Sequence, residues 1–321
     1  MAKIAFIFPG QGSQSVGMGK DFYQNFAGAR ETFDQGNEIL GFNIKEMIFN
    51  GSKEDLQDTA NTQPALLLTS IAILKVFSEA AIDRGLRGFN NGNSYPVACA
   101  GHSLGEFTAY VASHALSFRD GLLTVRKRGE LMAGADPKKK GAMAAIIGLN
   151  DSEVEEICKE VSKIGVIVPA NYNCPGQIVI SGERSAVEKG IELAKLKKAK
   201  MAVILDVSGA FHSPLIKDAS IEFEKFLSSI DINKPLYPVI SNVTADIIDY
   251  NNIKSSWVKQ MLSSVLWKKS VEKMIDMGVD IFIEVGAGKV LQGLVKKINK
   301  DVTVLGIDSL STLEKTLEQL K

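Results

Sequence analysis

The sequence predicts an α/β protein with a largely parallel sheet and a smaller, inserted subdomain. Two patterns carry this prediction. Short apolar runs typical of buried strands alternate with helical stretches along most of the chain, which indicates a sheet covered by helices on both faces. Between residues 136 and 206 the order becomes β-α-β-β-α-β, as in a ferredoxin-like module. We therefore expect a large domain formed by residues 1–135 and 207–321, and a ferredoxin-like subdomain over 136–206.

The composition indicates a large core and argues against several classes of partner. Of the 321 residues, 45% are hydrophobic, and 37 basic residues balance 37 acidic ones. This balance gives no electrostatic reason to expect nucleic acid as a partner. Residues 3–8 form a short apolar run with Pro and Gly directly after it, so they read as a first strand rather than a signal peptide. No stretch approaches the roughly 20 apolar residues that a membrane helix needs, so we expect no membrane contact.

Cysteine and histidine usage indicates the compartment and the absence of a metal site. Cys99, Cys158 and Cys174 are an odd number without metal-ligand spacing, which favours a reducing, cytoplasmic compartment. The chain has only three histidines and no H-E-x-x-H motif, so we expect neither a metal nor a cofactor.

A glycine-rich loop over 10–14 follows the first strand. A dinucleotide fingerprint would need a glycine where Ser15 stands, and a phosphate loop would need a lysine where Met18 stands. What remains is a loop with free backbone N–H groups, which is a possible source of an oxyanion-hole donor.

Helices lie on both sides of the central motif. The stretch 66–77 is apolar on most faces, so we expect a buried helix with Pro64 in its first turn. Residues 84–95 are rich in Gly and Asn and are typical of a loop. A further helix is expected to end at about residue 116.

Residues 97–106 are the stretch around which the chain is organised: a short apolar strand, a sharp turn and a helix that begins near Glu106. Gly101-His102-Ser103-Leu104-Gly105 fits the G-x-S-x-G nucleophile elbow. The backbone of a serine on such a turn is crowded from both sides, so the flanking positions must lack side chains. The Ser103 hydroxyl then stands clear of the sheet at a helix N-terminus, where negative charge is favoured. The motif predicts Ser103 as a nucleophile.

The helix over 118–132 carries an arginine that the pattern places inside the protein. Arg128 shares a mostly apolar face with Val125 and Met132. A guanidinium in such a position is buried and needs a carboxylate partner. The helical wheel alone does not exclude Arg126 from the same role.

The remaining elements complete the two domains. The expected strands cover residues 142–149, 166–173, 177–181, 201–205, 237–242, 280–285 and 302–307, and the expected helices cover 151–161, 183–198, 215–230, 257–262, 270–277, 290–298 and the C-terminal residues.

A serine hydroxyl is a poor nucleophile until a base takes its proton, and histidine is the usual base. His102 adjoins the nucleophile on a tight turn and is expected to point elsewhere, and His114 is expected to be an ordinary helix residue. His212 lies in a Gly- and Pro-flanked loop, and its position fits the nucleophile-first, histidine-last order of elbow-type folds. We therefore identify His212 as the candidate base. No acid that orients the imidazole is evident, although Asp206 and Asp218 are possible.

Together these motifs resemble the malonyl-CoA:acyl-carrier-protein transacylases, the malonyl acyltransferases of fatty-acid and polyketide synthesis. The resemblance runs over nearly the whole chain, through residues 8–14 (FPGQGSQ), 101–106 (GHSLGE) and 284–288 (EVGAG). It implies an α/β-hydrolase-like core with an inserted ferredoxin-like subdomain. It also implies ping-pong transfer of a malonyl group from malonyl-CoA to the phosphopantetheine thiol of acyl carrier protein.

The resemblance assigns roles to the reacting groups. Ser103 takes the acyl group as an ester, and His212 is the general base and acid. The backbone carbonyl of Gln260 holds the histidine, which accounts for the missing acid. Backbone N–H groups of Gln11 and Leu104 form the oxyanion hole, where each donor contributes about 3–4 kcal/mol to the transition state.

The resemblance also assigns the residues that bind the substrate. Arg128 clamps the free malonyl carboxylate with two parallel hydrogen bonds, so the substrate supplies the partner of this arginine. Gln63 and His102 line the pocket. Phe211 precedes the candidate base in a Gly-Ala-Phe-His segment, similar to the His-Ala-Phe-His of malonyl-selective enzymes except at its first position. Its ring leaves little room for an α-methyl group, a discrimination worth about 1–3 kcal/mol.

Two other interpretations use the same serine and histidine. One is an acyl-thioester hydrolase, and the other is a free-standing, trans-acting acyltransferase of a polyketide synthase. Arg128 and the inserted subdomain favour transfer, because ester hydrolysis needs neither. The sequence does not separate the fatty-acid pathway from the polyketide pathway. A non-catalytic binding module is disfavoured because nucleophile, base and arginine are all present.

Overall fold

The computed structural model describes residues 2–86, 96–136 and 140–321. Most of the predicted loop over 84–95 therefore lies outside the described residues.

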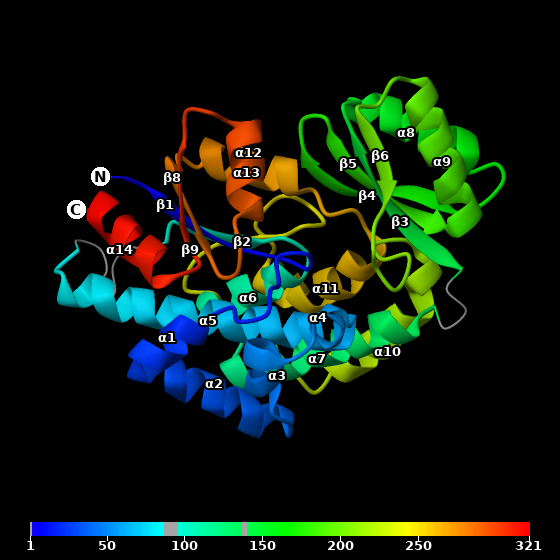
Figure 1. The fold of residues 1–321 in the computed structure, drawn as a ribbon. Helices are drawn as coiled ribbons and strands as arrows, with labels where there is room; N and C mark the ends of the chain where they lie inside the picture. Colours follow the sequence, from blue (N-terminus) through cyan, green and yellow to red (C-terminus); the bar gives the residue numbers. More distant parts are fainter. Residues whose placement is uncertain (1, 87–95, 137–139) are drawn as a thin grey trace.

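A parallel five-stranded sheet forms the centre of the large domain, in the order β7-β2-β1-β8-β9. All residues of β1 and β2 are buried, because helices cover both faces of the sheet. Figure 1 shows α12 and α13 on one side of the sheet and α5, α6 and α7 on the other. The predicted α/β class is confirmed. The strands are β1 (Ile4–Phe8), β2 (Ala98–Gly101), β7 (Val239–Ile240), β8 (Ile281–Val285) and β9 (Thr303–Ile307).

The helices of this domain carry most of its hydrophobic core. They are α1 (Lys20–Asn25), α2 (Ala27–Leu40), α3 (Ile44–Asn50), α4 (Lys53–Gln57), α5 (Thr59–Asp83), α6 (Leu104–Ala112), α7 (Phe118–Gly134), α10 (Lys217–Leu227), α11 (Ile253–Leu262), α12 (Trp267–Asp276), α13 (Val290–Ile298) and α14 (Leu310–Gln319), with short 3₁₀ turns at Pro214–Ile216 and Tyr250–Asn252.

Helix α5 begins earlier than predicted, because Asp58 caps it by accepting a hydrogen bond from the Ala60 N–H at 2.9 Å. Pro64 consequently lies inside the helix and not in its first turn. Proline has no N–H for the carbonyl four residues earlier, and the Arg126 guanidinium donates to that Ala60 carbonyl instead, at 3.0 Å.

Helix α5 also corrects the expectation about membrane segments. Its length and composition are sufficient for a membrane span, whereas no stretch was expected to approach that limit. Most of its apolar window is buried inside the protein, as in the core helix of a globular domain.

A second sheet of four antiparallel strands lies beside the first domain, in the order β4-β5-β3-β6 (Figure 1). Its buried apolar residues form one cluster with helices α8 and α9, while alternate residues such as Met143 and Val179 face the opposite way. The β-α-β-β-α-β order matches the predicted module, and its boundaries at 136 and 206 stay a prediction. The elements are β3 (Gly141–Ile147), α8 (Asp151–Val161), β4 (Ile167–Cys174), β5 (Gln177–Glu183), α9 (Arg184–Leu196) and β6 (Met201–Ile204).

Backbone hydrogen bonds join the edge strand β4 to the segment before α12. The Tyr172 N–H donates to the Val265 carbonyl at 2.9 Å, and the Val265 N–H donates to the Ala170 carbonyl at 2.8 Å. This pairing covers an otherwise open sheet edge. The free face of the small sheet and the turn after β2 line one cavity.

Candidate active site

The turn between β2 and α6 holds Ser103 in a strained conformation, with φ 51° and ψ −106°. A Cβ on Gly101 would collide with the backbone of Gly105, and a Cβ on Gly105 would collide with the Phe8 carbonyl. The two glycines are therefore required because the elbow is packed backbone against backbone. Ser103 is left at the N-terminus of α6, outside the carboxyl end of the parallel sheet.

The structure brings Ser103, His212 and Gln260 together. Ser103 Oγ lies 2.9 Å from His212 Nε2, and His212 Nδ1 lies 2.8 Å from the Gln260 carbonyl oxygen. Burial, and next the nearby charge of Arg128, lower the pKa of His212 to about 3. The imidazole is therefore neutral near pH 7, with its proton on Nδ1 facing the carbonyl and Nε2 free to accept the serine proton. Among the described residues, neither Asp206 nor Asp218 is a partner of this histidine.

Arg128 is buried, with 1% of its surface exposed, as its position on the apolar face of α7 predicts. It donates to Gln63 Oε1 at 2.8 Å, to Gln260 Oε1 at 3.0 Å and to Ser103 Oγ at 3.1 Å. Arginine has five N–H groups, so these three bonds leave two donors free. One of them is the Nε–H, which is buried and has no acceptor in the part of the chain that the structure describes. Burial lowers the pKa of Arg128 to about 10, so it stays cationic and can bind a carboxylate.

The residues that the sequence offered as alternatives to Arg128 and His212 have their contacts away from the serine hydroxyl. Arg126 is half-buried and donates to Glu130 at 2.7 Å, on the outer face of α7. His102 Nε2 contacts Asn173 Oδ1 of strand β4 at 2.8 Å, so this histidine links the elbow to the small sheet. His114 is exposed in the turn after α6.

A cavity of about 760 Å³ opens over Ser103 between the two sheets. The large domain contributes the predicted site residues, and the small sheet contributes the opposite wall. Gln63 was expected to line the pocket but does not. It lies behind Arg128, where its side-chain oxygen accepts a hydrogen bond from the guanidinium. The predicted residues that do line the cavity are Gln11, His102, Ser103, Leu104, Arg128, Phe211 and His212, and the small sheet adds Met143, Ala145, Asn171, Asn173, Gln177 and Val179.

Two backbone N–H groups flank the serine at the same sheet edge. Leu104 is the first residue of α6, so its N–H has no acceptor within the helix. The Ser103 N–H is engaged, because it donates to Asn242 Oδ1 at 2.7 Å. Strands β1 and β2 pair in parallel with Phe8 opposite Gly101, so the loop that carries Gln11 ends beside the elbow. This arrangement suits a pair of oxyanion donors.

Two residues of the site were missed by the sequence analysis. The Asn242 side chain accepts from the Ser103 N–H and donates to the Gly101 carbonyl at 2.8 Å. Glu106 is fully buried and accepts from the Asn242 N–H at 2.9 Å. Glu106 follows Ser103 by one helical turn, and Asn242 ends a predicted strand at the edge where sites of α/β proteins gather. Both signals were available in the sequence.

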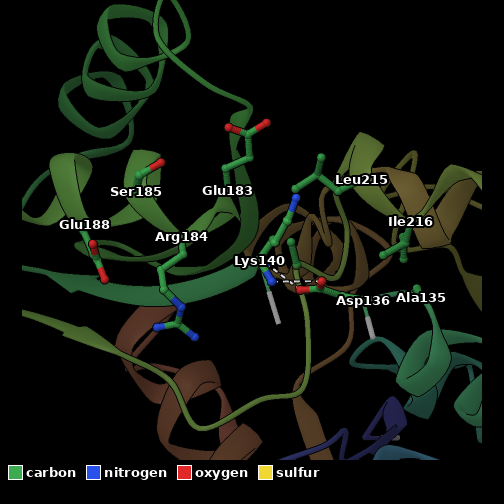
Figure 2. Close-up of a pocket in the computed structure, with 11 residues that line it drawn as sticks. Ala135, Asp136, Lys140, Glu183, Arg184, Ser185, Glu188, Leu215 and Ile216 are labelled. Carbon is green, nitrogen blue, oxygen red and sulfur yellow. Dashed lines mark hydrogen bonds between the residues drawn. The ribbon is translucent and has the colours of Figure 1, made fainter. Parts of the chain in front are cut away.

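A second cavity, of about 730 Å³, lies where the end of α7 meets the small sheet. Figure 2 shows charged side chains of both signs around it, including Asp136, Glu183 and Arg184. The Asp136 carboxylate accepts from the Lys140 backbone N–H at 2.9 Å. None of the predicted site residues lines this cavity, so the chemistry belongs to the first one.

The cysteines offer no competing nucleophile. Cys99, Cys158 and Cys174 are buried and free, and burial raises the pKa of each thiol. Buried thiols of this kind are inert.

Comparison with known proteins gives full-length matches. The family described as "Acyl transferase domain" matches residues 5–315. The "Malonyl CoA-acyl carrier protein transacylase" of Bacillus subtilis is 46% identical, over 100% of this chain and 98% of that protein. A crystal structure of the malonyl CoA-acyl carrier protein transacylase from Clostridium perfringens is 42% identical with a TM-score of 0.91, covering 99% of this chain and 97% of that one. A malonyl-transacylase in complex with a type II PKS acyl-carrier protein is 36% identical with a TM-score of 0.93, covering 99% of this chain and 100% of that one.

Proposed function

The chain belongs to the acyl transferase family, among the malonyl-CoA:acyl-carrier-protein transacylases, and we propose that it makes malonyl-acyl carrier protein through a malonyl ester of Ser103. One observation supports this assignment most strongly. Ser103 Oγ is in contact with His212 Nε2 at 2.9 Å and with Arg128 Nη2 at 3.1 Å. A general base and a receptor for a carboxylate thus converge on one hydroxyl, as a malonyl thioester requires.

In the first half-reaction His212 Nε2 takes the hydroxyl proton while Ser103 Oγ attacks the thioester carbonyl. The carbonyl oxygen becomes an oxyanion, which the N–H groups of Gln11 and Leu104 stabilise. The carbon–sulfur bond then breaks, and His212 returns its proton to the departing CoA sulfur. The Gln260 carbonyl stabilises the imidazolium by accepting from Nδ1 throughout the step.

The second half-reaction repeats these steps in reverse. The phosphopantetheine thiol of acyl carrier protein gives its proton to His212 Nε2, and its sulfur attacks the malonyl ester. The ester carbon–oxygen bond breaks and Ser103 Oγ recovers its proton from the histidine. The two thiol substrates therefore use the same base and the same oxyanion donors in turn, and no cofactor is needed.

Selectivity for the acyl group comes from the residues that face its free carboxylate and its α-carbon. Arg128 holds the free carboxylate of the malonyl group through two N–H donors. Phe211 is 4% exposed and lines the cavity directly before His212, where its ring restricts space at the α-carbon. The cavity thus favours a small, charged acyl group over a larger or uncharged one.

The relatives and the thiols support a pathway and a compartment. Relatives named malonyl CoA-acyl carrier protein transacylase support a role in supplying extender units for fatty-acid synthesis. A second candidate is supply to a polyketide synthase, which the neighbour bound to a type II PKS acyl-carrier protein favours. The three free, buried cysteines fit a cytoplasmic location.

The test is a transfer assay with malonyl-CoA and holo-acyl carrier protein in which malonyl-carrier protein and free malonate are measured together. The proposal predicts that carrier protein receives most of the malonyl groups, and that Ser103→Ala abolishes both products. Malonate release faster than transfer would identify a hydrolase instead. Carrier proteins from fatty-acid and polyketide systems, compared in the same assay, separate the two pathways.

A further inference from the structure

A buried carboxylate that the proposed reaction does not use lies directly behind the site. Glu106 has no exposed surface, and its Oε2 accepts from Gln260 Nε2 at 2.7 Å and from the Asn242 N–H at 2.9 Å. Its Oε1 has no hydrogen-bond partner among the described residues. Burial raises the pKa of Glu106 to about 7, against the opposing effect of these two hydrogen bonds. A carboxylate is costly to bury, so its place beside the site calls for an explanation.

Gln260 contacts the base, the arginine and the serine of the site. Its backbone oxygen accepts a hydrogen bond from His212 Nδ1 at 2.8 Å, and its side-chain oxygen accepts one from Arg128 Nη2 at 3.0 Å. Its side-chain nitrogen donates to the Ser103 carbonyl at 3.1 Å, besides its bond to Glu106. One residue thus positions the base, the carboxylate receptor and the nucleophile.

The orientation of the Gln260 amide is set by the hydrogen-bond donor on one side and the hydrogen-bond acceptor on the other. Its oxygen faces the guanidinium of Arg128, a donor, and its nitrogen faces the carboxylate of Glu106, an acceptor. A flipped amide would place nitrogen against nitrogen and oxygen against oxygen, and both contacts would be lost. Glu106, at 2.7 Å the shortest of the acceptors on this nitrogen, therefore keeps the amide oxygen directed at Arg128 together with the Ser103 carbonyl at 3.1 Å.

Glu106 fixes the elbow through a second route. Its Oε2 also holds the backbone of Asn242, whose side chain accepts from the Ser103 N–H at 2.7 Å and donates to the Gly101 carbonyl at 2.8 Å. A serine at φ 51° keeps that conformation only where its surroundings enforce it. The same carboxylate oxygen thus supports the strained turn and the amide beside it.

Resting on the proposed function, we propose that Glu106 is a positioning residue for malonyl transfer: its Oε2 locks Gln260 and Asn242, and so aims Arg128 at the substrate carboxylate and holds Ser103 in its turn. The hydrogen-bond acceptor at this position is essential and the negative charge is secondary. Gln260 and Asn242 both donate to one atom, Oε2, and a neutral oxygen in the same place can accept both bonds.

Three substitutions separate the acceptor from the charge. Glu106→Gln keeps an oxygen that can occupy the place of Oε2 and removes the charge. Glu106→Asp keeps the charge and withdraws the oxygens from both donors. Glu106→Met keeps the approximate volume and removes the acceptor altogether. Activity is measured as kcat/KM with malonyl-CoA and with acetyl-CoA, because only malonyl has a carboxylate for Arg128.

We expect Glu106→Gln to stay within about fivefold of the wild type with both substrates. In Glu106→Asp and Glu106→Met, kcat/KM with malonyl-CoA should fall by at least ~100-fold, because Arg128 loses its orientation. The fall in kcat/KM with acetyl-CoA should be smaller by a factor of at least ~10. If Glu106 only supported the fold, its loss would lower kcat/KM for both substrates by the same factor. That result, or an Asp variant more active than the Gln variant, would overturn the proposal.

Glu284→Met is the matched control. Glu284 is also a fully buried carboxylate, whose pKa burial raises to about 7, and it accepts from the N–H groups of Leu291 and Gln292. Its loss should lower Tm without changing the malonyl-to-acetyl ratio. Should Glu106→Met fail to fold, the comparison of Glu106→Asp with Glu106→Gln decides the question alone. A wild type without malonyl transfer would refute the proposed function, whereas an active wild type with an unchanged ratio in every variant would refute only the role of Glu106.

Discussion

Arg128→Ala tests the binding of the malonyl carboxylate. The wild-type guanidinium has two N–H donors free after its bonds to Gln63, Gln260 and Ser103. A hydrogen bond to a charged group contributes about 1.5–3 kcal/mol, so two of them contribute about 3–6 kcal/mol. At 1.4 kcal/mol for each factor of ten, kcat/KM for malonyl-CoA should fall by at least ~100-fold.

The same change should not cause a comparable loss of kcat/KM with acetyl-CoA. Acetyl has no carboxylate, and removal of the cation vacates space beside Ser103 Oγ. We expect kcat/KM for acetyl-CoA to stay within about threefold of the wild type or to rise. The assay follows CoA release from each thioester with holo-acyl carrier protein as acceptor.

Arg126→Ala is the matched control for this experiment. Arg126 lies on the same helix and donates to Glu130 and to the Ala60 carbonyl, away from the serine. Its removal should leave the malonyl-to-acetyl ratio unchanged. An equal loss on both substrates in Arg128→Ala would refute the clamp, because it would show that Arg128 supports the fold of the site rather than the substrate.

Three further predictions concern the Phe211 ring, the base His212 and the turn at Ser103. Phe211→Ser should raise the kcat/KM of methylmalonyl-CoA relative to malonyl-CoA by about 5- to 100-fold, because one methyl group is worth about 1–3 kcal/mol; an unchanged ratio would remove Phe211 from selectivity. Since the pKa of His212 is lowered to about 3, its neutral form persists as pH falls through 6.5, so kcat/KM should show no loss from histidine protonation between pH 5 and 8; a loss of kcat/KM with an apparent pKa near 6.5 that persists in Glu106→Gln would contradict this. Ser103→Gly should abolish transfer and raise the free energy of unfolding by about 1 kcal/mol, measured by denaturant titration, because glycine tolerates φ 51°; a lower stability would show that the turn is not strained.

Much of the fold could be predicted from the sequence because local patterns determine it. Helices α8 and α13 occupy the predicted residues, since each has a clear apolar face and a marked start, a capping box at Asn150 for α8 and a glycine-rich turn before α13. The boundaries of α5 were missed because its cap, Asp58, precedes a polar first turn. Pro64 suggested a later start, and only the contact of Arg126 with the Ala60 carbonyl explains how the helix accommodates it.

The site was predictable where its residues carry a motif or an unusual burial pattern. The elbow identified Ser103, and the apolar face of α7 identified Arg128. Gln63 and Gln260 could be placed at the site only through the family resemblance, and Asn242 was marked only by its position at a strand end, because all three reach the site from segments far apart in the chain. Their roles depend on which atom of an amide faces which neighbour, and that information exists only in three dimensions.

We infer that the malonyl group is carried on Ser103. Intact-protein mass spectrometry after brief incubation with malonyl-CoA tests it directly, with Ser103→Ala measured in parallel. We predict an added malonyl group on the wild type alone, and its loss on addition of holo-acyl carrier protein. An adduct that persists in Ser103→Ala, or transfer to carrier protein by that variant at the wild-type rate, would contradict the account.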